Sequence, residues 1–174
     1  SLLTPGAGGA DGAKSMDGII LAGGKGTRMQ PLTNTTPKPL LAIQGRPILE
    51  WSLLNLHGLV DQVLVVVNYM QDQIEAYMAQ QRIIPHYRLV EQRPEPLGTG
   101  HALQCCQPYL TQREFLVING DDLYDRESLE KLAAQPLGIL GVMRDDPIRF
   151  GVLIADEKGK LIHIHEKPDL YPAP

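Results

Sequence analysis

The chain of 174 residues fits a single domain, and with 43% hydrophobic residues it can bury a core and does not read as disordered. Its formal net charge of −4 argues against a nucleic-acid-binding protein, which would present a basic surface. Basic residues that carry a function must therefore act locally, on a small anionic ligand.

Neither the N-terminal residues nor the cysteines indicate export. Residues 1–15 are rich in Gly and Ala and lack the apolar stretch of a signal peptide, so we expect a flexible extension before a start at Met16. Cys105 and Cys106 are adjacent and cannot build a disulfide framework, which favours a reducing, cytoplasmic location. The longest aliphatic run, 63–67, is far too short to cross a bilayer, so no membrane contact is expected.

Strand and helix patterns alternate over residues 17–134. Short aliphatic runs that end at Gly, Asn or Asp predict strands, and apolar residues at helical spacing predict helices. The predicted strands are 17–21, 61–68, 86–91 and 114–119, and the predicted helices are 47–59, 69–81, 100–110 and 126–134. This order indicates right-handed crossovers and an α/β fold with a doubly wound, mostly parallel, Rossmann-like sheet.

The pattern changes toward the C-terminus. Residues 137–143, 150–156 and 160–166 predict additional antiparallel strands, and residues 157–159 predict a hairpin turn between the last two. Trp51 and the two cysteines are expected in the core.

A glycine-rich segment follows the first predicted strand. It reads Leu21-Ala22-Gly23-Gly24-Lys25-Gly26-Thr27-Arg28-Met29-Gln30-Pro31-Leu32-Thr33. Because it follows a strand, it should lie at the carboxyl edge of the sheet, where open α/β folds bind ligands. Its glycines let backbone N–H groups approach phosphate oxygens, and Arg28 adds a planar, permanently charged group. The segment therefore predicts a polyphosphate site.

Two common phosphate-binding loops are excluded. The dinucleotide pattern G-x-G-x-x-G fails because Met29 stands where the third glycine is required. A P-loop fails as well, since in residues 12–15 an alanine separates the glycine from the lysine and no predicted strand precedes them.

A longer pattern, which begins in the same glycine-rich segment, resembles that of a known family. Gly24-x-Gly26-Thr27-Arg28-x-x-Pro31-Leu32-Thr33, followed by Pro37-Lys38-Pro39, resembles the sugar-1-phosphate nucleotidylyltransferase family. That family includes uridylyl-, thymidylyl-, guanylyl- and adenylyltransferases of hexose 1-phosphates.

Further landmarks follow in the family's order. They are Gln92 with Leu97-Gly98-Thr99-Gly100-His101-Ala102, then Gly120-Asp121, then Phe150-Gly151-Val152, and finally Glu166-Lys167-Pro168. The first resembles the segment that reads the nucleobase, and a glutamine amide suits a pyrimidine edge because it both donates and accepts. The Gly-Asp pair resembles the family's magnesium site, and the last two resemble the sugar side. Asp122 is interpreted as a turn former.

The resemblance implies a role for each of these residues. Arg28, Lys38, Asp121 and Lys167 are the expected catalytic residues, with Mg²⁺ on Asp121. The expected nucleotide-binding residues are Leu21, Ala22, Gly23, Gly24, Gly26, Thr27, Gln92, Gly98 and Thr99. Gly151, Glu166 and Lys167 are expected to bind the sugar phosphate. The implied reaction is in-line attack of a sugar-phosphate oxygen on the α-phosphorus of a nucleoside triphosphate, which releases pyrophosphate.

The resemblance has one departure. Catalytic domains of the family continue beyond the Glu-Lys-Pro motif and supply a second metal-binding carboxylate there. We therefore expect residues 16–174 to be a catalytic domain truncated at its C-terminal end, and whether this part is active by itself stays open.

UTP or dTTP is the favoured triphosphate. A guanylyltransferase acting on mannose 1-phosphate, a cytidylyltransferase-type enzyme acting on a non-sugar phosphate, and a non-catalytic sugar-nucleotide-binding module remain alternatives. The expected partners are the two substrates, with no nucleic acid, and a homo-oligomer is left open.

Overall fold

The computed structural model describes residues 16–143 and 151–166, which form two compact units divided between Pro136 and Leu137. The first unit holds strands β1 (Asp17–Leu21), β2 (Ala42–Ile43), β3 (Arg46–Pro47), β4 (Gln62–Val67), β5 (Tyr87–Glu91) and β6 (Phe115–Asn119). Its helices are α1 (Ile48–Leu56), α2 (Gln71–Gln80), α3 (Thr99–Cys106) and α4 (Arg126–Ala133), with 3₁₀ turns η1 (Thr27–Met29), η2 (Leu32–Asn34), η3 (Lys38–Leu40) and η4 (Gln107–Tyr109). The second unit holds β7 (Gly151–Ala155) and β8 (Leu161–Glu166).

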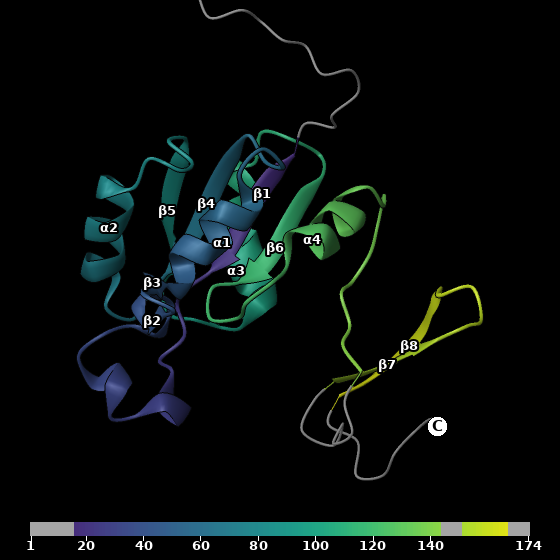
Figure 1. Ribbon diagram of the computed structural model, residues 1–174, viewed down its shortest axis with the longest axis horizontal. Coiled ribbons are helices and arrows are strands. Elements are labelled where there is room, and N and C mark those ends of the chain that lie inside the picture. Colours follow the sequence, from purple (N-terminus) through teal and green to yellow (C-terminus); the bar gives the residue numbers. More distant parts are fainter. Residues whose placement is uncertain (1–15, 144–150, 167–174) are drawn as a thin grey trace, which may run out of the picture. The chain divides into compact units, whose positions relative to one another are not determined.

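The centre of the first unit is a parallel four-stranded sheet in the order β5-β4-β1-β6 (Figure 1). In register, Ile20 of β1 lies beside Val65 of β4 and Ile118 of β6. Because all four strands run the same way, their carboxyl ends meet at one edge of the sheet. After β1 the chain adds β4 and β5 on one side of it and then β6 on the other side. Loops from both sides of β1 therefore converge at this edge. The predicted doubly wound α/β fold is confirmed.

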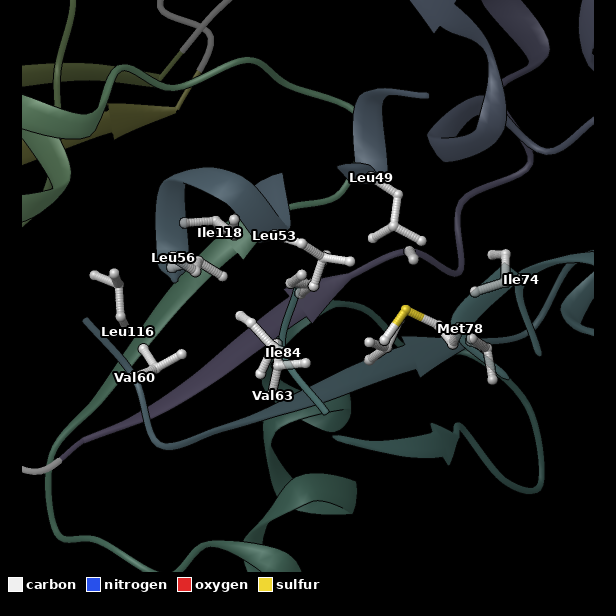
Figure 2. Packing of buried hydrophobic residues seen from close by; sticks show 14 of the residues in the cluster. Leu49, Leu53, Leu56, Val60, Val63, Ile74, Met78, Ile84, Leu116 and Ile118 are labelled. Atoms are coloured by element: carbon white, nitrogen blue, oxygen red, sulfur yellow. The ribbon is translucent and has the colours of Figure 1, made fainter. Parts of the chain in front are cut away.

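Helices cover both faces of this sheet. On one face α1, α2 and α4 pack over alternate residues of the central strands, among them Ile20, Val65 and Ile118, and Figure 2 shows part of this larger cluster. On the other face α3 packs Ala102 and Cys106 over the intervening strand residues. The central strand β4 is therefore buried on both faces, which explains the unbroken aliphatic run from Val63 to Val67.

A buried carboxylate stabilises the edge of the sheet where the strands begin, opposite the edge where they end. Asp17, at the start of β1, is fully buried and accepts hydrogen bonds from the backbone N–H of Thr111 (2.6 Å) and Gln112 (3.1 Å) and from Oγ1 of Thr111 (2.8 Å). These bonds satisfy carboxyl oxygens that would otherwise be costly to bury. They also hold the loop that leads into β6, so β6 is placed beside β1.

Hydrogen bonds also join α4 to the end of α1. The Arg126 guanidinium donates through one nitrogen to the carbonyl oxygens of Asn55 (3.0 Å) and His57, which belong to the unpaired carbonyls of a helix C-terminus. The side chain of Asn55 in turn donates to the carbonyl oxygen of Tyr124. The segment after β6 is thereby fixed against the sheet, which matters because that segment carries part of the pocket described below.

The second unit is an antiparallel hairpin. Gly151 of β7 lies opposite Glu166 of β8, and the predicted turn is confirmed, with Gly159 at φ +77° and its N–H bonded to the carbonyl oxygen of Asp156. The predicted strand at 137–143 is wrong. That segment is irregular and largely exposed, because a strand needs a neighbour for its backbone groups and none of the described strands pairs with it.

Most other predicted elements are confirmed to within one or two residues at each end, but the helix predicted at 100–110 ends at Cys106 and continues as the 3₁₀ turn η4. The expectation for Trp51 is wrong: its ring is half-buried, with Nε1 donating to the carbonyl oxygen of Ile43 (3.0 Å) and the Arg46 guanidinium 5.4 Å from its centroid. An indole N–H needs an acceptor, and here it finds one at the surface. Cys106 is fully buried as expected. None of the described helices has the length and apolar character needed to span a bilayer.

Candidate active site

A pocket of about 290 Å³ opens at the carboxyl edge of the sheet. It is bounded by the loops that follow β1, β5 and β6 and by the first turns of η3 and α3. The lining residues are Leu21, Ala22, Gly23, Gly24, Gly26, Lys38, Pro39, Val66, Gln92, Pro96, Gly98, Thr99, Ala102, Asn119 and Asp121. Its volume lies at the small end of the range of ligand sites, and its position is the one at which open α/β sheets bind ligands.

The glycine-rich loop after β1 is held in a compact turn. Gly26 has φ +59°, and a Cβ there would lie 2.9 Å from Cγ2 of Thr33 and 3.2 Å from Cβ of Lys38. Oγ1 of Thr33 donates to the carbonyl oxygen of Gly26 at 2.8 Å. The glycine therefore serves two needs, a left-handed backbone and close contact with the segment that carries Lys38.

Lys38 reaches across the pocket to Asp121. Its Nζ lies 2.8 Å from Oδ2 of Asp121, although the two residues are 83 positions apart in the chain. Both side chains remain partly exposed, at 25% and 43%, and both line the pocket. A cation and a carboxylate are thus fixed together where the glycine-rich loop ends.

Asp121 owes its place to tight packing of the preceding residue. A Cβ on Gly120 would lie 2.9 Å from the carbonyl oxygen of Leu21, so only glycine lets the end of β6 approach the end of β1 this closely. The N–H of Gly120 donates to that same oxygen at 2.8 Å. The carboxylate therefore emerges directly beside the glycine-rich loop.

The turn after Asp121 is fixed by polar contacts. The amide of Asn119 donates to Oδ2 of Asp122 at 3.0 Å, in agreement with its interpretation as a turn former. The hydroxyl of Tyr124 accepts from the N–H of Asn119 at 3.2 Å. Burial, opposed by its bond from Asn119 and reinforced by the nearby Asp122 and Asp121, raises the pKa of Tyr124, so this hydroxyl stays neutral and keeps its proton to donate.

The opposite end of the pocket carries an amide. Gln92 follows β5, is 7% exposed, and donates from Nε2 to the carbonyl oxygen of Gly98 at 3.1 Å. Nε2 also lies 3.4 Å from Nδ1 of His101, in the first turn of α3. The pocket therefore has a charged end, at Lys38 and Asp121, and a neutral hydrogen-bonding end at Gln92.

The structure brings together most of the site residues expected from the sequence. Those on the pocket wall are Leu21, Ala22, Gly23, Gly24, Gly26, Lys38, Gln92, Gly98, Thr99 and Asp121. Thr27 and Arg28 lie in the exposed turn η1 and are not part of this wall. Gly151 and Glu166, expected on the sugar side, are register partners in the second unit. Lys167 lies outside the described residues.

Five wall residues were not singled out from the sequence as site residues. They are Pro39, Val66, Pro96, Ala102 and Asn119. Pro39 and Ala102 stand inside the motifs, so their neighbours could have indicated them. Asn119 ends a predicted strand just before Gly-Asp, and strand ends were already the expected place for ligand contacts. Val66 gives no such signal, because a valine inside a buried strand looks like core.

The polar groups of the pocket fit one hard divalent cation that is held partly by the protein and partly by a bound phosphate ligand. Among residues 16–143 and 151–166 no group of three or more His, Cys, Asp or Glu is arranged to hold a metal, so a protein-only cage is not present in this part of the chain. Mg²⁺ is commonly held by one or two carboxylates together with waters and phosphate oxygens. Asp121, partly exposed on the pocket wall, suits that arrangement.

A parallel α/β sheet with a glycine-rich loop, a lysine and a carboxylate at its carboxyl edge is typical of proteins that bind phosphorylated nucleotides. Within that class, the chain belongs to the nucleotidyl transferase family, whose model matches residues 17–174. The resemblance on which the sequence interpretation depends is therefore confirmed.

Known proteins similar to this chain agree with that assignment. A protein of Methanocaldococcus jannaschii named bifunctional protein GlmU is 36% identical over 154 residues, which cover 88% of this chain and 36% of the relative. The chain thus spans about a third of the length of the curated relatives it matches. A putative glucose-1-phosphate thymidylyltransferase from Bacillus anthracis, solved with a sucrose, is 26% identical with a TM-score of 0.68 and covers 89% of this chain and 65% of that one.

A third similarity concerns the fold alone. A UDP-glucose pyrophosphorylase solved with UDP-glucose superimposes with a TM-score of 0.74, covering 89% of this chain and 70% of that one, at 20% sequence identity. The two proteins therefore share the arrangement of strands and helices although few of their residues are identical.

Proposed function

We propose that this chain carries the nucleotide-binding part of an enzyme that joins a sugar 1-phosphate to a nucleoside triphosphate. The observation that carries the proposal is the pocket itself, where Lys38 and Asp121 form an ion pair at the glycine-rich loop and Gln92 stands at the other end. One end suits a polyphosphate with its cation, and the other suits the edge of a base. Family membership supports the same reaction.

The reaction needs no protein nucleophile. An oxygen of the sugar phosphate attacks the α-phosphorus of the triphosphate, a new P–O bond forms, and the bond to the bridging oxygen of the β-phosphate breaks. Pyrophosphate leaves with that electron pair. Because both reactants are anionic, the protein's part is to bring them together and to stabilise the added negative charge.

Each proposed catalytic residue has a distinct task. Lys38, on the pocket wall, is proposed to neutralise charge at the α-phosphate. Arg28, in the exposed turn η1 next to the loop, is proposed to bind the departing pyrophosphate. Lys167 is proposed to hold the attacking sugar phosphate. When bound at Asp121, Mg²⁺ would supply charge neutralisation between phosphate groups.

The favoured triphosphate is UTP or dTTP. Gln92 presents a carboxamide at the neutral end of the pocket, and a pyrimidine with an imide N–H offers a matching donor. The similar protein from Bacillus anthracis, named a putative glucose-1-phosphate thymidylyltransferase, supports a pyrimidine. Its name also includes glucose 1-phosphate, and a hexose 1-phosphate is the proposed second substrate here, which Gly151 and Glu166 are proposed to bind.

Pyrophosphate release tests the proposal directly. Each of the four ribonucleoside triphosphates and dTTP is paired with glucose 1-phosphate, N-acetylglucosamine 1-phosphate and mannose 1-phosphate, using the full-length protein in Mg²⁺ buffer. The expected result is turnover with UTP or dTTP. A higher kcat/KM with GTP would favour the guanylyltransferase alternative. Sugar-nucleotide binding without any turnover would identify a non-catalytic module and refute the proposed reaction.

Other expectations from the sequence remain predictions. These are the cytoplasmic location, the homo-oligomer, the absence of a nucleic-acid partner, and the boundaries of the catalytic domain at 16–174.

A further inference from the structure

The carboxamide of Gln92 has only one orientation compatible with its neighbours. The carbonyl oxygen of Gly98, 3.1 Å away, can only accept a hydrogen bond, so the amide atom that faces it must be the NH₂ group. The same nitrogen lies 3.4 Å from Nδ1 of His101. Both protons of the NH₂ group are thereby used, and Oε1 is the amide atom that remains for a ligand.

This arrangement also determines which nitrogen of His101 carries the proton. Nδ1 faces a donor, so it must accept, and the ring proton of the neutral imidazole belongs to Nε2. Nε2 lies 3.7 Å from Sγ of Cys105, one helical turn further along α3 and able to accept weakly. The amide, the imidazole and the thiol thus form a chain of contacts with one consistent direction of donation.

We propose that His101 is a positioning residue for base selection. It fixes the Gln92 carboxamide with Oε1 toward the pocket, so that the site accepts a ring with an N–H donor and disfavours cytosine, whose N3 offers a lone pair. This inference deepens the proposed function and depends on it. His101 itself is not among the residues that line the pocket, so it acts through Gln92.

Loss of the acceptor at Nδ1 frees one of the two amide protons. In His101→Leu only the bond to Gly98 holds the carboxamide, so a turn that presents NH₂ to a bound base costs one hydrogen bond instead of two. The N3 lone pair of cytosine then meets an N–H donor. The ring N–H of uracil also meets an N–H donor, with which it cannot form a hydrogen bond. His101→Asn is the matched variant, because its side-chain oxygen can stand near the position of Nδ1 and accept from Gln92.

The test measures binding of UTP and CTP by calorimetry, with MgCl₂ and without sugar phosphate, on the full chain. The wild-type protein is expected to bind UTP at least about tenfold more tightly than CTP, the scale of one buried polar group left unpaired. His101→Leu should lower that ratio at least about fivefold, and His101→Asn should keep it within about twofold of wild type. In a Gln92→Ala background, where the ratio is already lost, His101→Leu should change it no further.

The outcomes separate the two proposals. A wild-type preference for UTP that survives His101→Leu overturns the role of His101 and leaves the proposed function standing. Equal binding of UTP and CTP by the wild type overturns base reading by Gln92 and, with it, the role of His101. Absence of triphosphate binding overturns the proposed function as well.

A second measurement does not depend on the folding of any variant. The ¹⁵N chemical shifts of the His101 ring in the wild-type protein report its tautomer, and the geometry requires the proton on Nε2. A neutral ring protonated on Nδ1 would overturn the proposal, because Nδ1 could then no longer accept from Gln92.

Discussion

Replacing Gly26 with alanine tests how the glycine-rich loop is built. The new methyl group would occupy a backbone with φ +59°, which costs an L-residue roughly 1–2 kcal/mol. It would also lie 2.9 Å from Cγ2 of Thr33, so Thr33 has to move, and its 2.8 Å bond to the carbonyl oxygen of Gly26 is lost at about 1 kcal/mol. The expected loss in free energy of unfolding is therefore about 2–3 kcal/mol.

Gly45 provides the matched control. Its φ is +79°, but a Cβ there would meet nothing within 4 Å, so Gly45→Ala carries the backbone cost without the steric one. Equilibrium unfolding in urea, followed by circular dichroism, gives both values. Gly26→Ala should be the less stable by about 1 kcal/mol, and its kcat/KM should fall because Lys38 is displaced as well. Equal destabilisation of the two variants would refute the close contact with Thr33.

Four further outcomes are expected. Arg28→Ala should reduce kcat at least about 100-fold with the fold intact by circular dichroism, and near-normal steady-state kinetics would remove its proposed role. Asp121→Asn should shift the activity titration to higher Mg²⁺ concentrations, since an amide is the poorer ligand, and an unchanged curve would leave Asp121 a turn residue only. Asp17→Ala should destabilise the protein by about 1–3 kcal/mol in urea, because the backbone N–H groups of Thr111 and Gln112 then lose their acceptor; wild-type stability would contradict the bonding described. Burial, with a smaller contribution from Cys105, raises the pKa of Cys106 from 9.0 to about 11. The unfolded chain therefore loses this proton first, so stability should fall between pH 9 and 11, and Cys106→Ala should make that fall shallower; an identical slope would exclude the thiol as its cause.

The parallel sheet could be predicted because its determinants are local. The valine-rich run of β4 and the aliphatic residues of β1 and β6 are buried on both faces, and each ends at residues that suit a loop. The strand predicted at 137–143 fails for the converse reason. Its apolar residues match a strand, but strand formation depends on a partner that its own sequence does not specify.

The sequence indicated most of the residues that line the pocket, but none of the contacts between them. Glycine and lysine motifs indicated which segments form the pocket, whereas the ion pair between Lys38 and Asp121 joins segments 83 residues apart. The relation between Gln92 and His101 was also missed, although both stand in segments that the sequence singled out. Residue type shows what a side chain can bond, and only the fold shows which neighbour it meets.

The ion pair between Lys38 and Asp121 means that each charge in the pocket already has a counterion. A phosphate that binds Lys38 has to displace a carboxylate, and a cation that binds Asp121 has to displace an ammonium group. Either ligand alone exchanges one attraction for another, while an anion and a cation arriving together satisfy both partners at once. By linkage, each should therefore strengthen the binding of the other. The pocket is in this sense selective for a neutralised pair of charges, which distinguishes a metal-bound polyphosphate from a free anion of similar size.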